Sequence, residues 1–140
     1  MAAKVVAKDL KDLKKLIKEA IKKNGPECDL NFIDVSKVTD MTELFSNEDE
    51  EFDFSEFNGD ISNWDVSNVT NMQCTFFRSS FNGDISEWNV SNVKNMMGMF
   101  AASKFNKDIS KWDVSNGLTC NLPSEWHNLT ATLASGMCLM

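Results

Sequence analysis

The chain contains the phrase Phe57-Asn58-Gly59-Asp60-Ile61-Ser62-Asn63-Trp64-Asp65-Val66-Ser67-Asn68-Val69-Thr70-Asn71-Met72, and further along it repeats this phrase as Phe81-Asn82-Gly83-Asp84-Ile85-Ser86-Glu87-Trp88-Asn89-Val90-Ser91-Asn92-Val93-Lys94-Asn95-Met96. A third copy starts at Phe105 and can be followed to Asn116. A fixed period of about 20 to 50 residues is typical of stacked repeat proteins, in which one unit is too small to bury its apolar face alone. The sequence therefore predicts a repeat fold.

Each unit combines a predicted strand with a predicted helix. The alternation of polar and apolar residues from Ser62 to Val66 is typical of a short strand. Ser67 or Asn68 supplies an N-cap for a short helix that runs to Phe77. The fold class is therefore an α/β repeat, a solenoid of short parallel strands and short helices. The predicted inward columns are Ile61 and Ile85, Trp64 and Trp88, Val66 and Val90, Val69 and Val93, Met72 and Met96, and Phe76 and Phe100.

An earlier, diverged copy of the unit lies between Leu30 and Phe45. Val35, Val38, Met41 and Phe45 align with Val66, Val69, Met72 and Phe76, but the spacing between these two copies is longer than the regular period. The excess falls within the acidic segment from Ser46 to Glu56. Insertions in solenoids map to loops, so we expect this segment to bulge from the stack.

Both ends of the chain carry candidate caps. From Val5 to Ile21 apolar residues recur at three- and four-residue spacing with lysines between them, which predicts an amphipathic helix that Asn24-Gly25-Pro26 ends. We favour a cap on the first repeat over binding to a membrane surface or an acidic partner. The segment after Asn116 is apolar enough to cover the last repeat, and the alternative is a partner-seeking tail.

Length and composition favour one domain. With 140 residues and 42% hydrophobic content, the chain can build one continuous core. The predicted organisation of 1–140 is a capping helix at 1–26, a diverged repeat with an acidic loop at 27–56, regular repeats at 57–116, and a cap or tail at 117–140. The formal net charge of −7 divides into +5 over residues 1–23 and −12 over the rest. Most of the surface should therefore repel DNA, and we expect no direct nucleic-acid binding.

Targeting signals and cysteine motifs are not visible. The sequence has no run of 18 apolar residues and no signal peptide, so we expect no membrane span and, as written, a cytoplasmic protein. Cys28, Cys74, Cys120 and Cys138 show no metal-binding spacing. We expect them to be free, mostly buried thiols in a reducing compartment.

Repeated Asp and Asn residues form polar columns, such as Asp60, Asp84 and Asp108. Convergent oxygen ligands could indicate calcium. We favour a structural role, in which these side chains satisfy backbone groups in stacked turns, and we predict no metal site. Gly59 and Gly83 are placed where a turn would need positive φ.

No catalytic motif stands out. The only histidine, His127, lies near Cys120 and Glu125, but nothing in the pattern fixes their geometry. Phosphate-binding loops and dinucleotide fingerprints are not found. We therefore predict no enzyme activity and no cofactor.

The phrase Asn-Gly-Asp-Ile-Ser-x-Trp-(Asp/Asn)-Val-Ser-Asn-Val-x-Asn-Met, with the Met/Phe pair that follows it, resembles the BspA-type leucine-rich-repeat surface proteins of bacteria, including the related lipoprotein-associated repeat. The resemblance covers roughly residues 30 to 116. It implies a leucine-rich-repeat-like solenoid without catalytic residues. Members of this family are commonly exported adhesins, and similar repeats occur in short intracellular and phage-carried proteins.

We predict a non-enzymatic module that binds a protein partner, as a monomer or with weak self-association. Repeat proteins vary their outward columns, so the candidate residues are those that differ between copies. These are Asn63, Glu87 and Lys111 in the strand column, and Thr70, Lys94, Gln73, Met97, Arg78 and Ala102 around the helix. The second candidate site is the acidic loop with Glu48, Asp49, Glu50, Glu51, Phe52 and Phe54. The alternatives are a phage-type inhibitor that blocks a nucleic-acid-handling enzyme through its acidic surface, and a structural or adhesin-like surface component.

Overall fold

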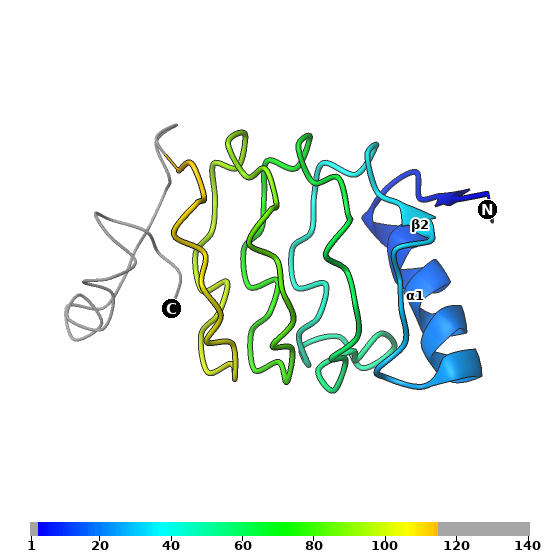
Figure 1. Ribbon diagram of the computed structural model, residues 1–140. Helices are drawn as coiled ribbons and strands as arrows, with labels where there is room; N and C mark the ends of the chain where they lie inside the picture. Colours follow the sequence, from blue (N-terminus) through cyan, green and yellow to red (C-terminus); the bar gives the residue numbers. More distant parts are fainter. Residues whose placement is uncertain (1–2, 115–140) are drawn as a thin grey trace.

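The computed structural model describes residues 3–114. Within this range the chain forms one helix, α1 (Leu10–Asn24), and two short strands, β1 (Val5–Val6) and β2 (Ile33–Asp34). The strands pair in parallel, with Val5 opposite Ile33. The remaining described chain winds through turns in successive coils that lie side by side, starting next to α1 (Figure 1).

α1 begins and ends at residues that satisfy its terminal backbone groups. Asp9 is the N-cap, and its side chain accepts a 2.8 Å hydrogen bond from the backbone N–H of Asp12. Gly25 ends the helix with a φ of 86° and donates its N–H to the Ile21 carbonyl at 2.7 Å. The predicted helix, from Val5 to Ile21, starts too early, because the residues before Asp9 form β1 and pair with β2.

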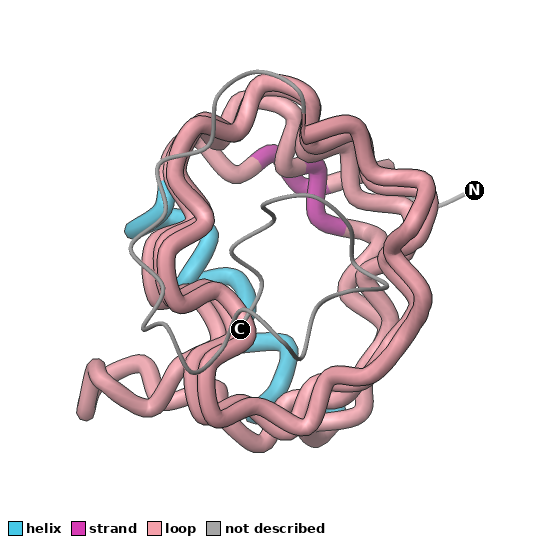
Figure 2. The backbone as a smooth tube through the Cα atoms, turned by 90° about the vertical axis from the view of Figure 1, so that its left-hand side faces the viewer, coloured by secondary structure: helices cyan, strands magenta, loops and turns pink. Residues whose placement is uncertain are grey.

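Successive coils contact each other at equivalent positions of the sequence repeat. Parallel bridges join Asp40 with Asn71, and Asn71 with Asn95. The backbone N–H of Met72 donates to the Asn95 carbonyl at 2.8 Å. Viewed along the stack, the coils follow nearly the same path around one interior (Figure 2). Equivalent positions of successive coils therefore form columns.

The coils are built from turns, and the short strand and short helix predicted for each repeat unit are not found among residues 57–114. Cys74 and Arg78 have φ values of 53° and 54°, a left-handed conformation that interrupts a right-handed helix. Between them a turn forms, in which Phe77 N–H donates to the Cys74 carbonyl at 3.1 Å. The same conformation recurs in the next coil, at Gly98 and Ala102.

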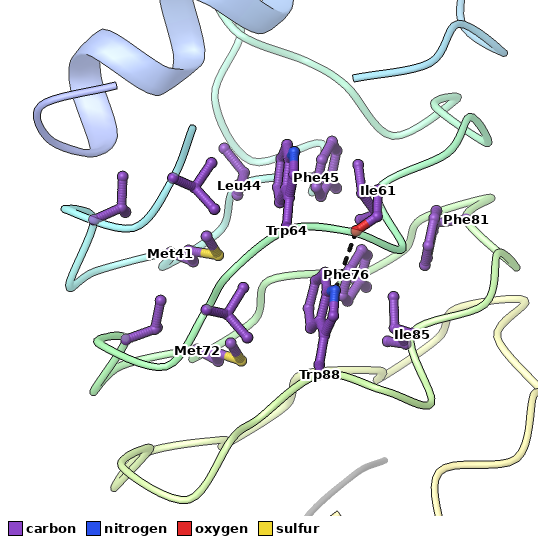
Figure 3. Packing of buried hydrophobic residues seen from close by; sticks show 14 of the residues in the cluster. Met41, Leu44, Phe45, Ile61, Trp64, Met72, Phe76, Phe81, Ile85 and Trp88 are labelled. Atoms are coloured by element: carbon purple, nitrogen blue, oxygen red, sulfur yellow. Dashed lines mark hydrogen bonds between the residues drawn. The ribbon is translucent and has the colours of Figure 1, made fainter. Parts of the chain in front are cut away.

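Aromatic rings stack along columns in the interior. The ring centroid of Phe76 lies 5.4 Å from that of Phe45 in one neighbouring coil and 5.4 Å from that of Phe100 in the other. Figure 3 shows the same order for Met41 above Met72 and for Trp64 above Trp88. The residues predicted to point inward are buried, as expected. Two further ring columns are formed by Phe57, Phe81 and Phe105 and by Trp64, Trp88 and Trp112, with neighbouring centroids 6.1 to 6.5 Å apart.

Each tryptophan of the column also donates a hydrogen bond to the preceding coil. Nε1 of Trp88 lies 3.1 Å from the Ile61 carbonyl oxygen (Figure 3). Trp64 and Trp112 make the equivalent bonds to the carbonyls of Leu30 and Ile85, at 2.9 and 3.0 Å. These bonds satisfy buried polar groups on both partners, so they join the coils in one register.

α1 lies across the end of the stack, beside the first coil (Figure 1). Leu13, Ile17 and Ala20 are buried and belong to the same apolar cluster as the coil residues. The lysines of α1 other than the half-buried Lys14 are exposed. The cap or tail predicted at 117–140 lies outside the described residues.

Close approach between coils explains the repeated glycines. Neither Gly59 nor Gly83 has the positive φ predicted for it. A Cβ atom at Gly59 would instead overlap the carbonyl oxygen of Cys28 in the preceding coil. Gly59 is therefore required for coil packing rather than for a left-handed turn.

Candidate functional site

The most variable exposed positions lie in one column, directly beside the tryptophan column. We call Phe32, Asn63, Glu87 and Lys111 the outer column. Each precedes a buried residue, which is Ile33 in the first coil and a tryptophan in the other three. All four residues are exposed, including 38% of Phe32. The outer column thus presents a different side chain on every coil over an almost constant interior.

Two of the predicted residues contact each other across neighbouring coils. Nζ of Lys111 lies 2.8 Å from Oε1 of Glu87, and both side chains are 71% exposed. The hydrogen bond to Glu87 raises the pKa of Lys111. An exposed pair of this kind adds little to stability, so these charges are free to serve recognition.

The structure does not bring all predicted residues to the outer column. Lys94 is exposed in another column, where its backbone N–H donates to the Thr70 carbonyl at 2.8 Å. Arg78 is exposed at a left-handed turn, and its guanidinium carbon lies 5.0 Å from the ring centroid of Phe77. Within residues 3–114, neither Lys94 nor Arg78 forms an ion pair with the outer column.

The acidic segment at 46–56, which we call the inserted loop, packs against α1 through its aromatic residues. Phe52 and Phe54 are only 9% and 5% exposed, and their rings contact each other edge to face. Both rings are therefore buried rather than on an open surface, and their contact with a partner stays a prediction. Nothing in the loop's own sequence indicates this burial, because the covering helix comes from a distant, earlier part of the chain.

Lysines of α1 fix the position of the inserted loop. Nζ of Lys14 lies 3.1 Å from Oδ2 of Asp49, and the side chains are 12% and 35% exposed. Nζ of Lys18 lies 4.9 Å above the ring centroid of Phe52, a cation–π contact. The hydrogen bond from Lys14 is the main reason that the pKa of Asp49 is lowered. Asp49 is thus an internal anchor, whereas Glu48, Glu50 and Glu51 remain exposed and available to a partner.

The repeated aspartates close turns, which agrees with the structural role predicted for them. Oδ1 of Asp65 accepts hydrogen bonds from the backbone N–H and the hydroxyl of Ser67. Asn89 accepts the same pair of bonds from Ser91 in the next coil, without a charge. These turns also explain the missing strand, because they bend the chain at intervals of about five residues. Asp60 and Asp84 accept the equivalent pairs of bonds from Ser62 and Ser86, and Asp108 accepts the backbone N–H of Ser110.

These bonds predict that the folded protein loses stability in acid. The hydrogen bonds from Ser67 lower the pKa of Asp65 in the folded state, and bonds from Ser62 and Ser86 lower those of Asp60 and Asp84. A lowered folded-state pKa stabilises the fold above the unfolded value, about 3.9 for Asp, and this contribution disappears as the pH falls through the folded value. We expect thermal stability to be nearly constant above about pH 5 and to fall below about pH 4.

A triple variant tests this cause. Replacing Asp60, Asp65 and Asp84 together by asparagine keeps the acceptor oxygens, as Asn89 does naturally. We expect lower stability than native at pH 7, because asparagine loses the charge-assisted part of each bond, and a weaker decline in acid, measured by thermal melts between about pH 2.5 and 7. An unchanged acid decline would show that other groups cause it.

Chemical groups for catalysis or metal binding are sparse in the described part of the chain. Among residues 3–114, no group of three or more His, Cys, Asp or Glu side chains is placed to hold a metal ion. Cys28 and Cys74 are free, half-buried thiols, and burial is the main cause that raises the pKa of each. Cys120, Glu125 and His127, which the sequence analysis considered as a catalytic set, lie outside the described residues. No helix in the described range is long and apolar enough to cross a membrane.

Sequence reasoning missed two features of the surface. Phe32 belongs to the outer column, and the alignment that pairs Val35 with Val66 also pairs Phe32 with Asn63, so the signal was present. The second feature is a groove between α1 and the inserted loop, lined by Ile21 and Phe54 among others. No local sequence pattern indicates it, since its two walls come from separate elements.

Comparisons with known proteins place the chain in a family without naming an activity. No curated protein and no solved structure matches the chain. The family described as "Mycoplasma protein of unknown function, DUF285" matches residues 11–123. Because this match covers most of the 140 residues, the chain belongs to that family.

Proposed function

We propose that the protein is a non-enzymatic interaction module with a leucine-rich-repeat-like solenoid architecture, and that it binds a protein partner through the outer column. The observation that carries this proposal is the contrast between two adjacent columns. Trp64, Trp88 and Trp112 are identical and buried. The residues before them, Asn63, Glu87 and Lys111, are exposed and differ in charge.

Physical reasons favour a protein partner for this column. Its exposed side chains run from an aromatic residue, Phe32, through a neutral amide to a negative and a positive charge. Such a sequence of different groups on a rigid frame gives specificity through complementary contacts rather than through one deep pocket. The resemblance of the repeat phrase to BspA-type leucine-rich-repeat proteins supports the same class of function. Proteins of one fold can have unrelated functions, so the partner has to be found by experiment.

A charge swap within the outer column tests the proposal. Replacing Glu87 by lysine and Lys111 by glutamate keeps the net charge and lets the ion pair re-form, so the unfolding free energy should change by less than about 0.5 kcal/mol. The partner is first captured from a lysate of the source cells and identified by mass spectrometry. Its affinity for the swapped chain, measured with purified proteins, should fall about tenfold or more because like charges now face each other.

The matched control changes a charge outside both candidate sites. Glu27→Lys alters an exposed carboxylate that belongs to neither the outer column nor the inserted loop. Retained partner binding by Glu27→Lys, together with its loss in the swapped chain, would support recognition by the column. Equal affinity of the native and swapped chains would contradict it.

A further inference from the structure

Two adjoining hollows lie between α1 and the inserted loop. Their volumes are about 330 and 290 Å³. Ile21, Asp53 and Phe54 line both hollows, so we treat them as one continuous feature and call it the loop groove. No other chain segment within residues 3–114 lines the first hollow.

Two apolar side chains line both hollows and form what we call the apolar floor of the groove. Ile21 is half-buried on the last turns of α1, and Phe54 is buried on the inserted loop. Pockets for small ligands have volumes of about 300 to 1,000 Å³, so one hollow is near the lower limit of that range and the other just below it. The hollows therefore suit individual apolar side chains better than one bulky ligand.

The walls of the groove are charged and unequal. Glu50, Glu51 and Asp53 are exposed on the loop wall, and none of them forms an ion pair with another described residue. Lys18 and Lys22 stand on the α1 wall. Nζ of Lys18 already makes its cation–π contact with the ring of Phe52. Because the loop-wall carboxylates form no ion pair with another described residue, they favour a ligand that brings positive charge beside the apolar floor.

The loop wall is held in place before any ligand arrives. Lys14 on α1 anchors Asp49, and Asp49 in turn accepts the backbone N–H of Glu51 at 3.0 Å. At the other end of the loop, Ser80 N–H donates to the Ser55 carbonyl at 2.6 Å. A wall anchored at both ends loses little conformational freedom when a ligand binds.

We propose that the loop groove binds an extended peptide segment of a partner protein, in which an apolar side chain is flanked by basic residues. The apolar side chain enters a hollow above Ile21 and Phe54, and the basic residues lie along Glu50, Glu51 and Asp53. Two hollows in succession fit a linear segment, whose side chains follow one another at regular spacing. The inference shares with the proposed function only the assumption that the partner is a protein.

A synthetic peptide tests the groove directly. The probe is a fluorescently labelled ten-residue peptide of glycine and serine that carries one leucine flanked by two lysines. Two matched probes replace the leucine by serine or the lysines by glutamates. By fluorescence anisotropy with the full chain, we expect the first probe to bind at least about tenfold more tightly than either matched probe.

Two substitutions on opposite walls and one remote control decide the outcome. Glu51→Lys should weaken binding of the leucine–lysine probe by about tenfold, and Lys22→Glu should strengthen it. Glu87→Lys makes the same change of charge as Glu51→Lys but in the outer column, so it should leave the affinity within about twofold. Equal weakening by Glu51→Lys and Glu87→Lys, or equal binding of the leucine and serine probes, would overturn the proposal in favour of unspecific attraction.

The two proposals fail separately. A chain that binds its partner through the outer column but binds none of the probes would overturn the groove inference alone. If the chain binds the leucine–lysine probe, but the charge swap at Glu87 and Lys111 leaves its affinity for the partner unchanged, the proposed function alone would be overturned.

Discussion

Replacing Trp88 by alanine is expected to destabilise the protein by about 3–5 kcal/mol, a large part of the total stability of a small domain. The side chain is only 4% exposed, and its ring lies between Trp64 and Trp112 at centroid distances of 6.4 and 6.5 Å. Its Nε1–H also donates a hydrogen bond to the Ile61 carbonyl of the preceding coil. Urea unfolding followed by circular dichroism measures the change.

A conservative variant separates packing from hydrogen bonding. Trp88→Phe keeps an aromatic ring in the column but removes the Nε1–H, so the Ile61 carbonyl keeps only the backbone N–H of Trp64 as a donor, at 3.2 Å. We expect a cost of about 0.5–1.5 kcal/mol, the range for one lost hydrogen bond and smaller than the cost of alanine. The neighbouring Glu87→Ala serves as the exposed control, with an expected effect within about 0.5 kcal/mol. A Trp88→Ala chain as stable as this control would refute the role assigned to the tryptophan column.

The position of Trp88 sharpens this expectation. In a repeat protein each unit contacts only its neighbours, so stability depends on the interfaces between adjacent units. Trp88 belongs to both interfaces of its coil, through Trp64 on one side and Trp112 on the other. Its loss should therefore weaken the coupling of the coils on either side and lower the denaturant dependence of unfolding as well as the midpoint.

The interior of the stack could be predicted from the sequence because identical residues recur at a fixed period. A column such as Met72 and Met96 has the same environment in each coil, so repetition alone identifies what is buried. Local conformation could not be predicted in this way. The residues after Met72 have a helix-like spacing of apolar positions, but the left-handed conformations of Cys74 and Arg78 exclude a helix. Cysteine and arginine rarely adopt a left-handed conformation, so the sequence does not indicate it at Cys74 and Arg78. Gly98, which is equivalent to Cys74 in the next coil, adopts it without strain.

The surface was partly predictable for the same reason. Variation between copies marked Asn63, Glu87 and Lys111 as outward, and the structure shows them exposed. The inserted loop has no copy with which to compare it. Its contacts with α1, such as Lys14 with Asp49, join residues 35 positions apart, and only the folded chain brings them together.

Gly59→Ala is the second substitution with a large expected effect. An added Cβ would overlap the carbonyl oxygen of Cys28 and approach a ring carbon of Phe57 to 2.7 Å. The carbonyl cannot move away without cost, because it accepts the N–H of Asp60 at 3.3 Å. Separating the two coils at this point should cost about 1–3 kcal/mol or more, the range for overpacked interiors. Urea unfolding of the purified variant gives the value.

Gly83→Ala is the matched control, one coil further along. There a Cβ would meet the Phe81 ring at 2.8 Å, but the nearest backbone atom, the Gly59 carbonyl oxygen, is 3.3 Å away. The fourth coil already carries Lys107 at the equivalent position, so the repeat accepts a side chain there. We therefore expect Gly83→Ala to cost clearly less than Gly59→Ala. Equal losses would mean that the ring contact, and not the Cys28 carbonyl, makes glycine necessary, and the first two coils would then approach no more closely than the others.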